Sequence, residues 1–237
     1  MTWQDLKRDL IANAPLDLDI QPNPAFDPRN PSRAKRHNLQ LSASRGGFRF
    51  RSLGYGMNKR AFLVEEPSGA QDWVLAVSSG LSSAKTDMEG EAQKLIDLGK
   101  ADVPVPAPFN EANVGLRDIL FELRVIDNDG NDSEQTCFLQ QYLPFIEMDK
   151  INKSQPDFAS NRILVSGKKP PMHNRTVGDL KKIKKELKRQ EWGDFQVMYD
   201  SVSGGVYVFD PLPTNTSGES PLPWVKKWIE DIESAPT

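Results

Sequence analysis

The chain has 237 residues, of which 38% are hydrophobic and 27% charged, and its formal net charge is −3. This length and composition are typical of a folded aqueous protein with one large domain or two small ones. The small net charge excludes a whole-molecule field that would attract nucleic acid or a membrane, so neither is an expected partner.

The N-terminal 45 residues predict a short helix followed by an extended arm. One helix face is indicated by the spacing of Trp3, Leu6, Leu10 and Ile11, and Pro15 would end that helix. Residues 15–45 then contain five prolines and no sustained apolar period, which is typical of an irregular segment. We therefore interpret residues 1–45 as a helix and an extended arm, either wrapped on the body or partly free, before a domain that spans residues 46–237.

From residue 46 the pattern changes to strands. Runs of β-branched and aromatic residues predict strands at 48–53, 60–66 and 73–78. An amphipathic helix is predicted at 86–98, and two further strands are predicted at 119–126 and 136–142. The order is three strands, one helix and two strands, which would give a five-stranded sheet with one helix.

The second half of the chain predicts two helices and a hairpin. A helix at 176–190 is indicated by an apolar stripe, while its other faces carry six lysines and arginines between 181 and 189. We interpret those charges as a solvated face, because the helix lacks the aromatic residues that stack on RNA bases. A hairpin at 196–210 turns at residues 203–205, and a last helix covers 223–232. The whole pattern indicates an α+β fold.

Two short stretches resemble the two halves of a protein-kinase active site. Residues 53–64 contain the Gly-x-Gly pair Gly54 and Gly56, and residues 193–200 precede a turn that leads to Asp210-Pro211. The predicted order of strands and helix is also that of a kinase N-lobe. Residues 46–213 resemble the minimal protein-kinase-like effectors and toxins of bacteria, with the HopBF type as the nearest. The resemblance implies a bilobal fold with an N-lobe at about 46–143 and a reduced C-lobe at about 144–237.

The first stretch departs from the usual kinase pattern at two positions. Lys59 stands where the third glycine of the loop belongs, and Ser78 stands where the third strand normally carries the phosphate-pairing lysine. This resembles the with-no-lysine kinases, which relocate that lysine to the same loop position. The resemblance implies that Lys59 contacts the phosphates of ATP, beside the backbone amides of Gly54 and Gly56. Lys85 is the alternative cation.

A kinase lysine is held by a carboxylate from the helix. By resemblance this carboxylate is Glu91, with Glu89 as the second choice. The sequence Tyr142-Leu143-Pro144-Phe145 follows an apolar strand and would be the hinge that contacts adenine through backbone groups, so Leu143 joins the expected nucleotide site.

The second stretch would supply the acid–base and metal groups. By the kinase order, Gln196 replaces the magnesium-binding asparagine, and Asp210 replaces the aspartate that holds the metal. For the catalytic base, strict spacing favours Glu191, whereas the Asp-x-Gln arrangement of the minimal family favours Asp194. We prefer Asp194, because it is two residues from Gln196 in a strand and so shares its face.

The resemblance implies an enzyme that uses ATP and Mg²⁺ to phosphorylate a protein on serine, threonine or tyrosine. Two alternatives stay open: a pseudokinase that binds nucleotide or protein, and transfer of AMP by the same fold. The 27 residues after Asp210 leave no room for a full activation segment and helical C-lobe.

The sequence also bears on the compartment. Cys137 is the only cysteine, so no internal disulfide can form, and no cysteine and histidine cluster is available for zinc. The chain has no apolar run of about 18 residues and begins without the apolar segment of a signal peptide. We expect a cytoplasmic protein, or one delivered into the cytosol of a target cell by a non-classical bacterial secretion system, as the resemblance implies.

Overall fold

The structure, a computed structural model, describes residues 2–18, 44–45, 48–55, 59–65, 73–79, 83–127, 129–143, 146–148, 163–164, 167–189, 192–213 and 221–237. These residues form both helices and strands, so the fold is mixed α+β, as the sequence predicts. The chain divides into two units. The first unit consists of residues 1–92 and 114–142, and the second of residues 93–113 and 143–237.

A seven-stranded sheet lies at the centre of the first unit, in the order β1-β6-β7-β5-β4-β3-β2. Its strands are β1 (Leu16–Asp17), β2 (Ser44–Arg45), β3 (Phe48–Tyr55), β4 (Lys59–Glu65), β5 (Trp73–Ser78), β6 (Phe121–Ile126) and β7 (Asp132–Gln141). Neighbours are antiparallel except β1 and β6, which are parallel. All five predicted strands are present. The two strands that were not predicted, β1 and β2, have two residues each.

The burial of the strands follows their place in the sheet. All six residues of β5, the central strand, are buried, as expected for a strand covered on both faces. In β6, by contrast, Phe121, Leu123 and Val125 are buried while Glu122 and Arg124 are exposed. One face of β6 therefore lies in the core. Ser78, the polar residue at the end of β5, is also buried.

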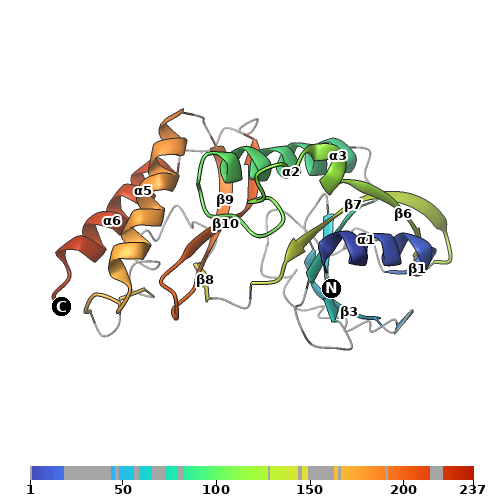
Figure 1. Cartoon of the computed structure of the whole chain (residues 1–237), viewed down its shortest axis with the longest axis horizontal. Coiled ribbons are helices and arrows are strands. Elements are labelled where there is room, and N and C mark those ends of the chain that lie inside the picture. Colours follow the sequence, from blue (N-terminus) through green and yellow to red (C-terminus); the bar gives the residue numbers. More distant parts are fainter. Residues whose placement is uncertain are drawn as a thin grey trace. The chain divides into compact units, whose positions relative to one another are not determined.

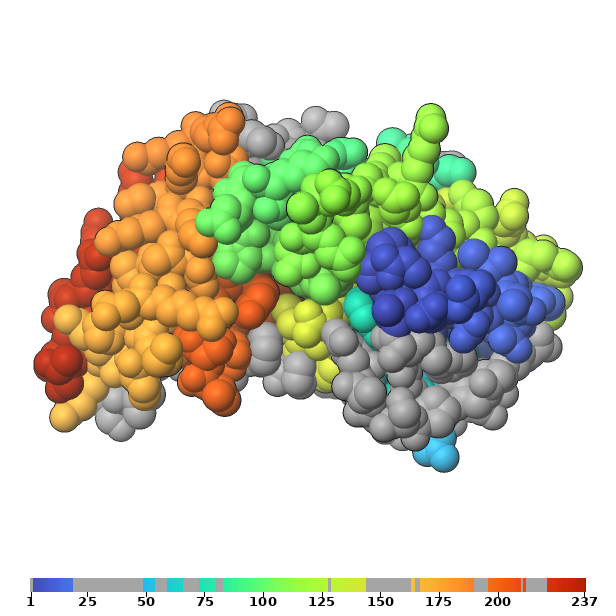
Figure 2. Space-filling view, in the orientation of Figure 1, coloured from blue at the N-terminus to red at the C-terminus, as the bar shows by residue number. Residues whose placement is uncertain are grey.

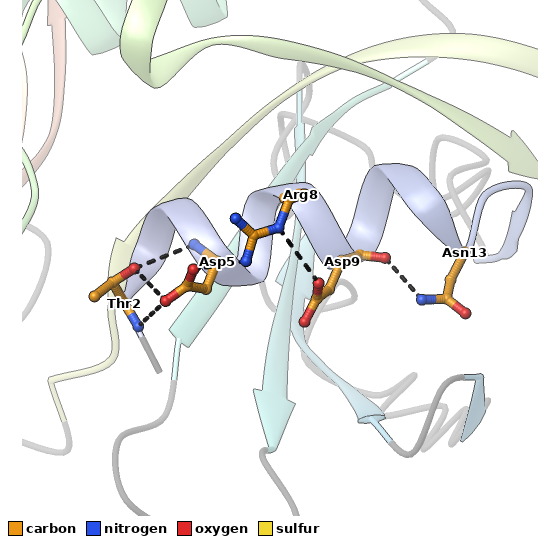
Figure 3. Close-up of polar contacts among 5 residues, drawn as sticks. All are labelled: Thr2, Asp5, Arg8, Asp9 and Asn13. Carbon is orange, nitrogen blue, oxygen red and sulfur yellow. Dashed lines mark hydrogen bonds and ion pairs between the residues drawn. The ribbon is translucent and has the colours of Figure 1, made fainter.

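The predicted N-terminal helix is present as α1 (Trp3–Ala12). It begins with a capping box, in which the Thr2 hydroxyl accepts from the backbone N–H of Asp5 and the Asp5 carboxylate accepts from the N–H of Thr2 (Figure 3). At the other end the side-chain amide of Asn13 donates to the Asp9 carbonyl at 2.8 Å. The helix packs against β6 and β7, and Figure 2 shows it in blue at the surface of the first unit.

Lys7 ties α1 to the end of α3 (Leu116–Ile119). Its ammonium donates to the backbone carbonyl oxygens of Asp118 at 2.6 Å and Leu120 at 3.1 Å. Burial lowers the pKa of Lys7, and the charge of Asp118 partly opposes this shift. Residues 2–18 therefore belong to the first unit. The rest of the expected arm, apart from β2, lies outside the described residues.

The long helix α2 (Ala84–Lys100) contains the predicted helix and extends it at both ends. Its buried side chains recur at helical spacing and include Met88, Ala92, Leu95 and Ile96. The division between the two units falls after Ala92, within this helix. The chain returns to the first unit at Val114 and leaves it again after Tyr142.

The second unit combines a three-stranded sheet with two helices. Its strands, in the order β10-β9-β8, are β8 (Ile146–Met148), β9 (Trp192–Tyr199) and β10 (Val206–Pro213). The helices are α5 (His173–Arg189) and α6 (Leu222–Ser234), which pack side by side (Figure 1). Both helices and the β9–β10 hairpin are predicted from the sequence. β8 is a short strand in a region that the sequence leaves without pattern.

The turn of the β9–β10 hairpin is fixed to α5. Gly204 has a φ of +72°, a conformation that favours glycine. Thr176 of α5 donates its hydroxyl to the Gly204 carbonyl at 2.8 Å, and the Asp179 carboxylate accepts from the N–H of Val206 at 3.2 Å. On its outer side β10 is bonded to the extended tract before residue 108, because Val208 N–H donates to the Pro104 carbonyl at 2.9 Å.

Candidate active site

Lys59 and Ser78 are direct neighbours across two strands. Lys59 is the first residue of β4 and Ser78 the last of β5, and the register pairs them. Directly opposed side chains of an antiparallel pair lie on the same face, with Cβ atoms about 5 Å apart. The side chain of Lys59 therefore leaves the sheet on the same face, and at nearly the same place, as a lysine side chain at position 78 would.

The ion pair predicted between Lys59 and Glu91 is present. The ammonium nitrogen of Lys59 lies 2.5 Å from both carboxylate oxygens of Glu91, which comes from the first half of α2. Glu91 is only 3% exposed and Lys59 is 20% exposed. The ring centroid of the buried Phe138 is 5.9 Å from the same nitrogen. Both partners belong to the first unit.

The burial of the pair has a cost that its contacts must offset. Removing a carboxylate and an ammonium from water costs several kcal/mol each, and their attraction offsets this only when the geometry is good. Such a pair is therefore weak evidence for a role in stability. Buried, strongly interacting charges are enriched at functional sites, where they hold a charge in a fixed place. The geometry is suited to presenting a fixed ammonium group to an anion.

Ser78 has its own hydrogen bonds. It is 3% exposed, its hydroxyl donates to the side-chain oxygen of Gln135 at 2.7 Å, and it accepts from the N–H of Thr136 at 3.1 Å. Gln135 in turn donates to the Ser133 hydroxyl at 3.0 Å. Position 78, where the kinase pattern has a lysine, is thus occupied by a serine. Its hydroxyl group both donates and accepts a hydrogen bond.

Lys85, the alternative cation, is engaged elsewhere. Its ammonium contacts the Glu122 carboxylate of β6 at 2.9 Å, and both side chains are partly exposed. This hydrogen bond, and then the charge of Glu122, raise the pKa of Lys85. Of the two expected cations, Lys59 is therefore the one that pairs with Glu91.

The glycine loop is described only in part. Gly54 lies in β3 opposite Ala61, next to a register shift that leaves Leu53 without a partner in β4. Such a bulge bends a strand and changes the direction in which the following residues lie. Gly56, the second expected glycine, lies outside the described residues, as do positions 57 and 58.

The expected metal and base residues occupy adjacent strands of the second unit. The register pairs Gln196 with Phe209 and Asp194 with Leu212, so that Asp210 and Pro211 together oppose Phe195. Two residues against one is a β-bulge, a feature found often beside active sites. Gln196 is 9% exposed. The structure thus brings the backbones of Asp194, Gln196 and Asp210 together in one hairpin, while Glu191 lies outside the described residues.

The amide oxygen of Gln196 and the carboxylate of Asp210 are oxygen ligands of the kind that Mg²⁺ prefers. Among the described residues, no group of three or more histidines, cysteines and carboxylates is placed to hold a metal ion.

Leu143, the expected hinge residue, follows β7 by two positions and is buried, at 6% exposed. It is the first residue of the second unit after the division at Tyr142. Pro144 and Phe145, which complete the expected hinge, lie outside the described residues. The structure therefore places Leu143 where the chain passes from one unit to the other.

Asp200 is a turn residue of the β9–β10 hairpin. Its carboxylate accepts from the N–H of Val202 at 2.9 Å and from the Ser203 hydroxyl. Burial raises the pKa of Asp200, but these hydrogen bonds outweigh burial and the pKa is lowered overall. Asp200 therefore fixes the turn between β9 and β10.

The charged face of α5 is partly neutralised within the second unit. Lys181 pairs with Glu233 at 2.7 Å, Lys182 with Asp102 at 2.8 Å, and Arg189 with Glu186 at 3.0 Å. These pairs support the interpretation of this face as a solvated surface. They do not provide a dedicated phosphate-binding site.

The sequence did not reveal Gln135, Thr136 or Glu122 as parts of this region. Their contacts with Ser78 and Lys85 cross from β5 and α2 to β6 and β7, so they depend on strand register. The one available signal was the polar run at residues 133–136, directly before the apolar residues 137–139.

Comparison of the chain with protein-family models and with curated protein sequences gave no match. Within the part of the chain that the structure describes, no helix has the length and apolar content needed to cross a membrane.

Proposed function

We propose that the protein is a kinase-like phosphotransferase that moves the γ-phosphoryl group of ATP to a hydroxyl group of a protein substrate. The observation that carries this proposal is the Lys59–Glu91 pair, with Lys59 directly opposite Ser78. Phosphoryl transfer by kinases requires a lysine on the phosphates that is held by a helix carboxylate. A lysine on the neighbouring strand, held in the same way, meets this requirement.

The order of elements also supports a bilobal kinase-like fold. Three strands, β3 to β5, precede α2, and two strands, β6 and β7, follow it before Leu143, from which the rest of the chain belongs to the second unit. The second unit then carries a hairpin with Asp194, Gln196 and Asp210 in the expected order. We infer a reduced C-lobe built on this hairpin and on α5 and α6.

Each residue has a defined role in the proposal. Lys59 binds the α- and β-phosphates, and the backbones of Gly54, Gly56 and Leu143 contribute to the nucleotide site. Asp194 accepts the proton of the substrate hydroxyl. The hydroxyl oxygen forms a bond to the γ-phosphorus while the bond from that phosphorus to the β–γ bridging oxygen breaks, and ADP is released. Mg²⁺, held by Gln196 and Asp210, would neutralise charge on the phosphate oxygens.

The same proposal includes the biological setting implied by the family that the sequence resembles. In that setting the protein is a bacterial effector that acts in the cytosol of a target cell on a host protein. Purification of phosphorylated proteins from a eukaryotic lysate, followed by mass spectrometry, would identify the acceptor and distinguish serine or threonine from tyrosine.

The direct test uses ATP labelled on the γ- or the α-phosphate, with Mg²⁺ and a cell lysate as the source of acceptors. We expect transfer of the γ label only, and its loss in Lys59→Ala and Asp210→Ala. Lys185→Ala, which changes an exposed lysine of α5, is the matched control and should transfer normally. Transfer of the α label would instead indicate AMP transfer. Absence of both labels, with ATP binding still seen by calorimetry, would indicate a pseudokinase.

A further inference from the structure

A row of polar residues crosses the sheet of the first unit beneath α2. Glu122 in β6 pairs with Thr136 in β7, and Lys59 in β4 pairs with Ser78 in β5. Because Val77 pairs with Cys137, Ser78 comes next to Thr136, and the N–H of Thr136 donates to the Ser78 hydroxyl. The row therefore runs without a gap through four neighbouring strands, from Glu122 to Lys59.

The helix α2 is bonded to both ends of this row. Lys85 binds Glu122 at one end, and Glu91 binds Lys59 at the other. Lys85 and Glu91 are six residues apart, which corresponds to about 9 Å along the helix axis and about 120° around it. Two contacts that differ in both position and direction define how far the helix is displaced along its axis and how it is rotated. The first half of α2 cannot slide or turn without breaking one of them.

The two contacts differ in environment. The Lys59–Glu91 pair is buried, whereas Lys85 is 60% exposed and Glu122 is 38% exposed. The Glu122 carboxylate is itself oriented, because the Thr136 hydroxyl lies 3.0 and 3.1 Å from its two oxygens. An exposed pair adds little to stability. Because the Glu122 carboxylate is oriented, however, the Lys85–Glu122 pair can still favour one axial position and rotation of α2 over the adjacent ones.

We propose that Lys85, Glu122 and Thr136 are positioning residues, which hold the first half of α2 at the depth and rotation where Glu91 meets Lys59. They do not touch the phosphates. Their effect on catalysis acts through Glu91, and this functional part rests on the phosphotransferase activity proposed above. The positioning itself concerns the structure of the first unit and can be measured without any activity.

The first arm of the test is hydrogen exchange of the full chain, followed by mass spectrometry. Glu122→Gln keeps the shape of the side chain and removes its charge. We expect amides of residues 84–92 to exchange about 3- to 10-fold faster in this variant, with little change in β5 or β7. Raising the salt concentration should increase the exchange of the same segment in the unmodified protein, because an exposed pair is screened.

The chain offers a matched control in the same two strands. Arg124 and Asp132 form an ion pair between β6 and β7 whose side chains are 59% and 41% exposed, close to the values for Lys85 and Glu122. Asp132→Asn should leave exchange of residues 84–92 unchanged. The charge exchange Lys85→Glu with Glu122→Lys should restore the exchange of this segment to within about twofold of the original protein, since the attraction is restored.

The second arm measures the single-turnover rate of γ-phosphate transfer and the dissociation constant of ATP. We expect Glu122→Gln to lower the rate about 3- to 10-fold while ATP affinity changes less than twofold, and the charge exchange to restore the rate. Unchanged exchange of residues 84–92 in Glu122→Gln would overturn the positioning role. Altered exchange in a protein that never transfers phosphate would instead support positioning and contradict the proposed function.

Discussion

Lys59 and Ser78 face each other across β4 and β5, and only Lys59 reaches Glu91. The hydroxyl of Ser78 is turned into a separate network with Gln135 and Thr136. Two neighbouring positions on one face of the sheet therefore have different partners: Lys59 pairs with a helix carboxylate, and Ser78 bonds to β7. This difference makes the proposed relocation of the lysine testable by substitution.

We expect Lys59→Ala to lower γ-phosphate transfer about 100-fold or more, the usual effect of removing a group that stabilises transition-state charge. Adding Ser78→Lys to that variant should recover about tenfold, because the new lysine starts on the same face within about 5 Å. The recovery should be partial, since the Ser78 hydrogen bonds are lost. The measurement is the initial rate of label transfer.

The control for this exchange is Ser78→Ala alone, which removes the hydroxyl and adds no charge. It should retain most of the activity if Ser78 only supports the strand. Normal transfer by Lys59→Ala would show that Lys59 is not the phosphate-binding cation. A folded double variant that is no more active than Lys59→Ala would contradict the geometric equivalence of the two positions.

Glu91 should matter for stability as well as activity. Glu91→Ala leaves the ammonium of Lys59 mostly buried without its carboxylate, and breaking a buried pair in this way costs about 3–5 kcal/mol. The joint change Lys59→Met with Glu91→Leu should cost less, because it removes both charges of the pair together. Urea unfolding followed by circular dichroism gives both free energies of unfolding. A joint variant less stable than Glu91→Ala would contradict this account.

The elements that the sequence predicted are those with a clear period. Alternation in β6 and the apolar stripe of α5 identified both elements to within a few residues. The strands β1, β2 and β8 escaped prediction because two or three residues are too few to show alternation, and their pairing is decided by the rest of the sheet.

The candidate site shows a similar division. The Lys59–Glu91 contact was predicted from the resemblance to kinases, in which the helix after the third strand holds the lysine with a carboxylate. The contacts of Lys85 and Ser78 could not be predicted, because they depend on which residues of β6 and β7 lie opposite each other. A register shift of one residue would place those side chains on the other face.

Two helical glycines should respond in opposite directions to alanine. At Gly178 of α5 a Cβ would meet nothing within 4 Å, so Gly178→Ala should stabilise the protein by about 0.5–1 kcal/mol through helix propensity. At Gly99 of α2 a Cβ would lie 2.2 Å from the backbone oxygen of Phe109. Gly99→Ala should therefore lower the midpoint of thermal unfolding although it gains the same propensity. Equal stabilisation by both changes would refute the close approach.

Cys137 should not react with thiol reagents in the folded protein. Its side chain is fully buried in β7, and burial raises the pKa of the thiol well above its usual value, so the reactive thiolate is scarce at neutral pH. We expect no measurable reaction with a disulfide reagent at pH 8 and one equivalent after unfolding in urea. A fast reaction of the folded protein would show that β7 opens readily.

The stability of the second unit should depend on pH through Asp179. Burial raises the pKa of this carboxyl above its usual value, and the hydrogen bond from the N–H of Val206 partly opposes the shift. An acid with a raised pKa in the folded state favours folding most fully below its unfolded pKa, near 3.8, and this contribution is lost as the pH rises through the folded pKa. Asp179→Asn keeps the acceptor for Val206 and removes the titration. The stability of the original protein relative to Asp179→Asn should therefore fall as the pH rises from 3 to 7. The measurement is the difference between the urea midpoints of the two proteins. A difference that stays constant or rises over this range would contradict the burial of this charge.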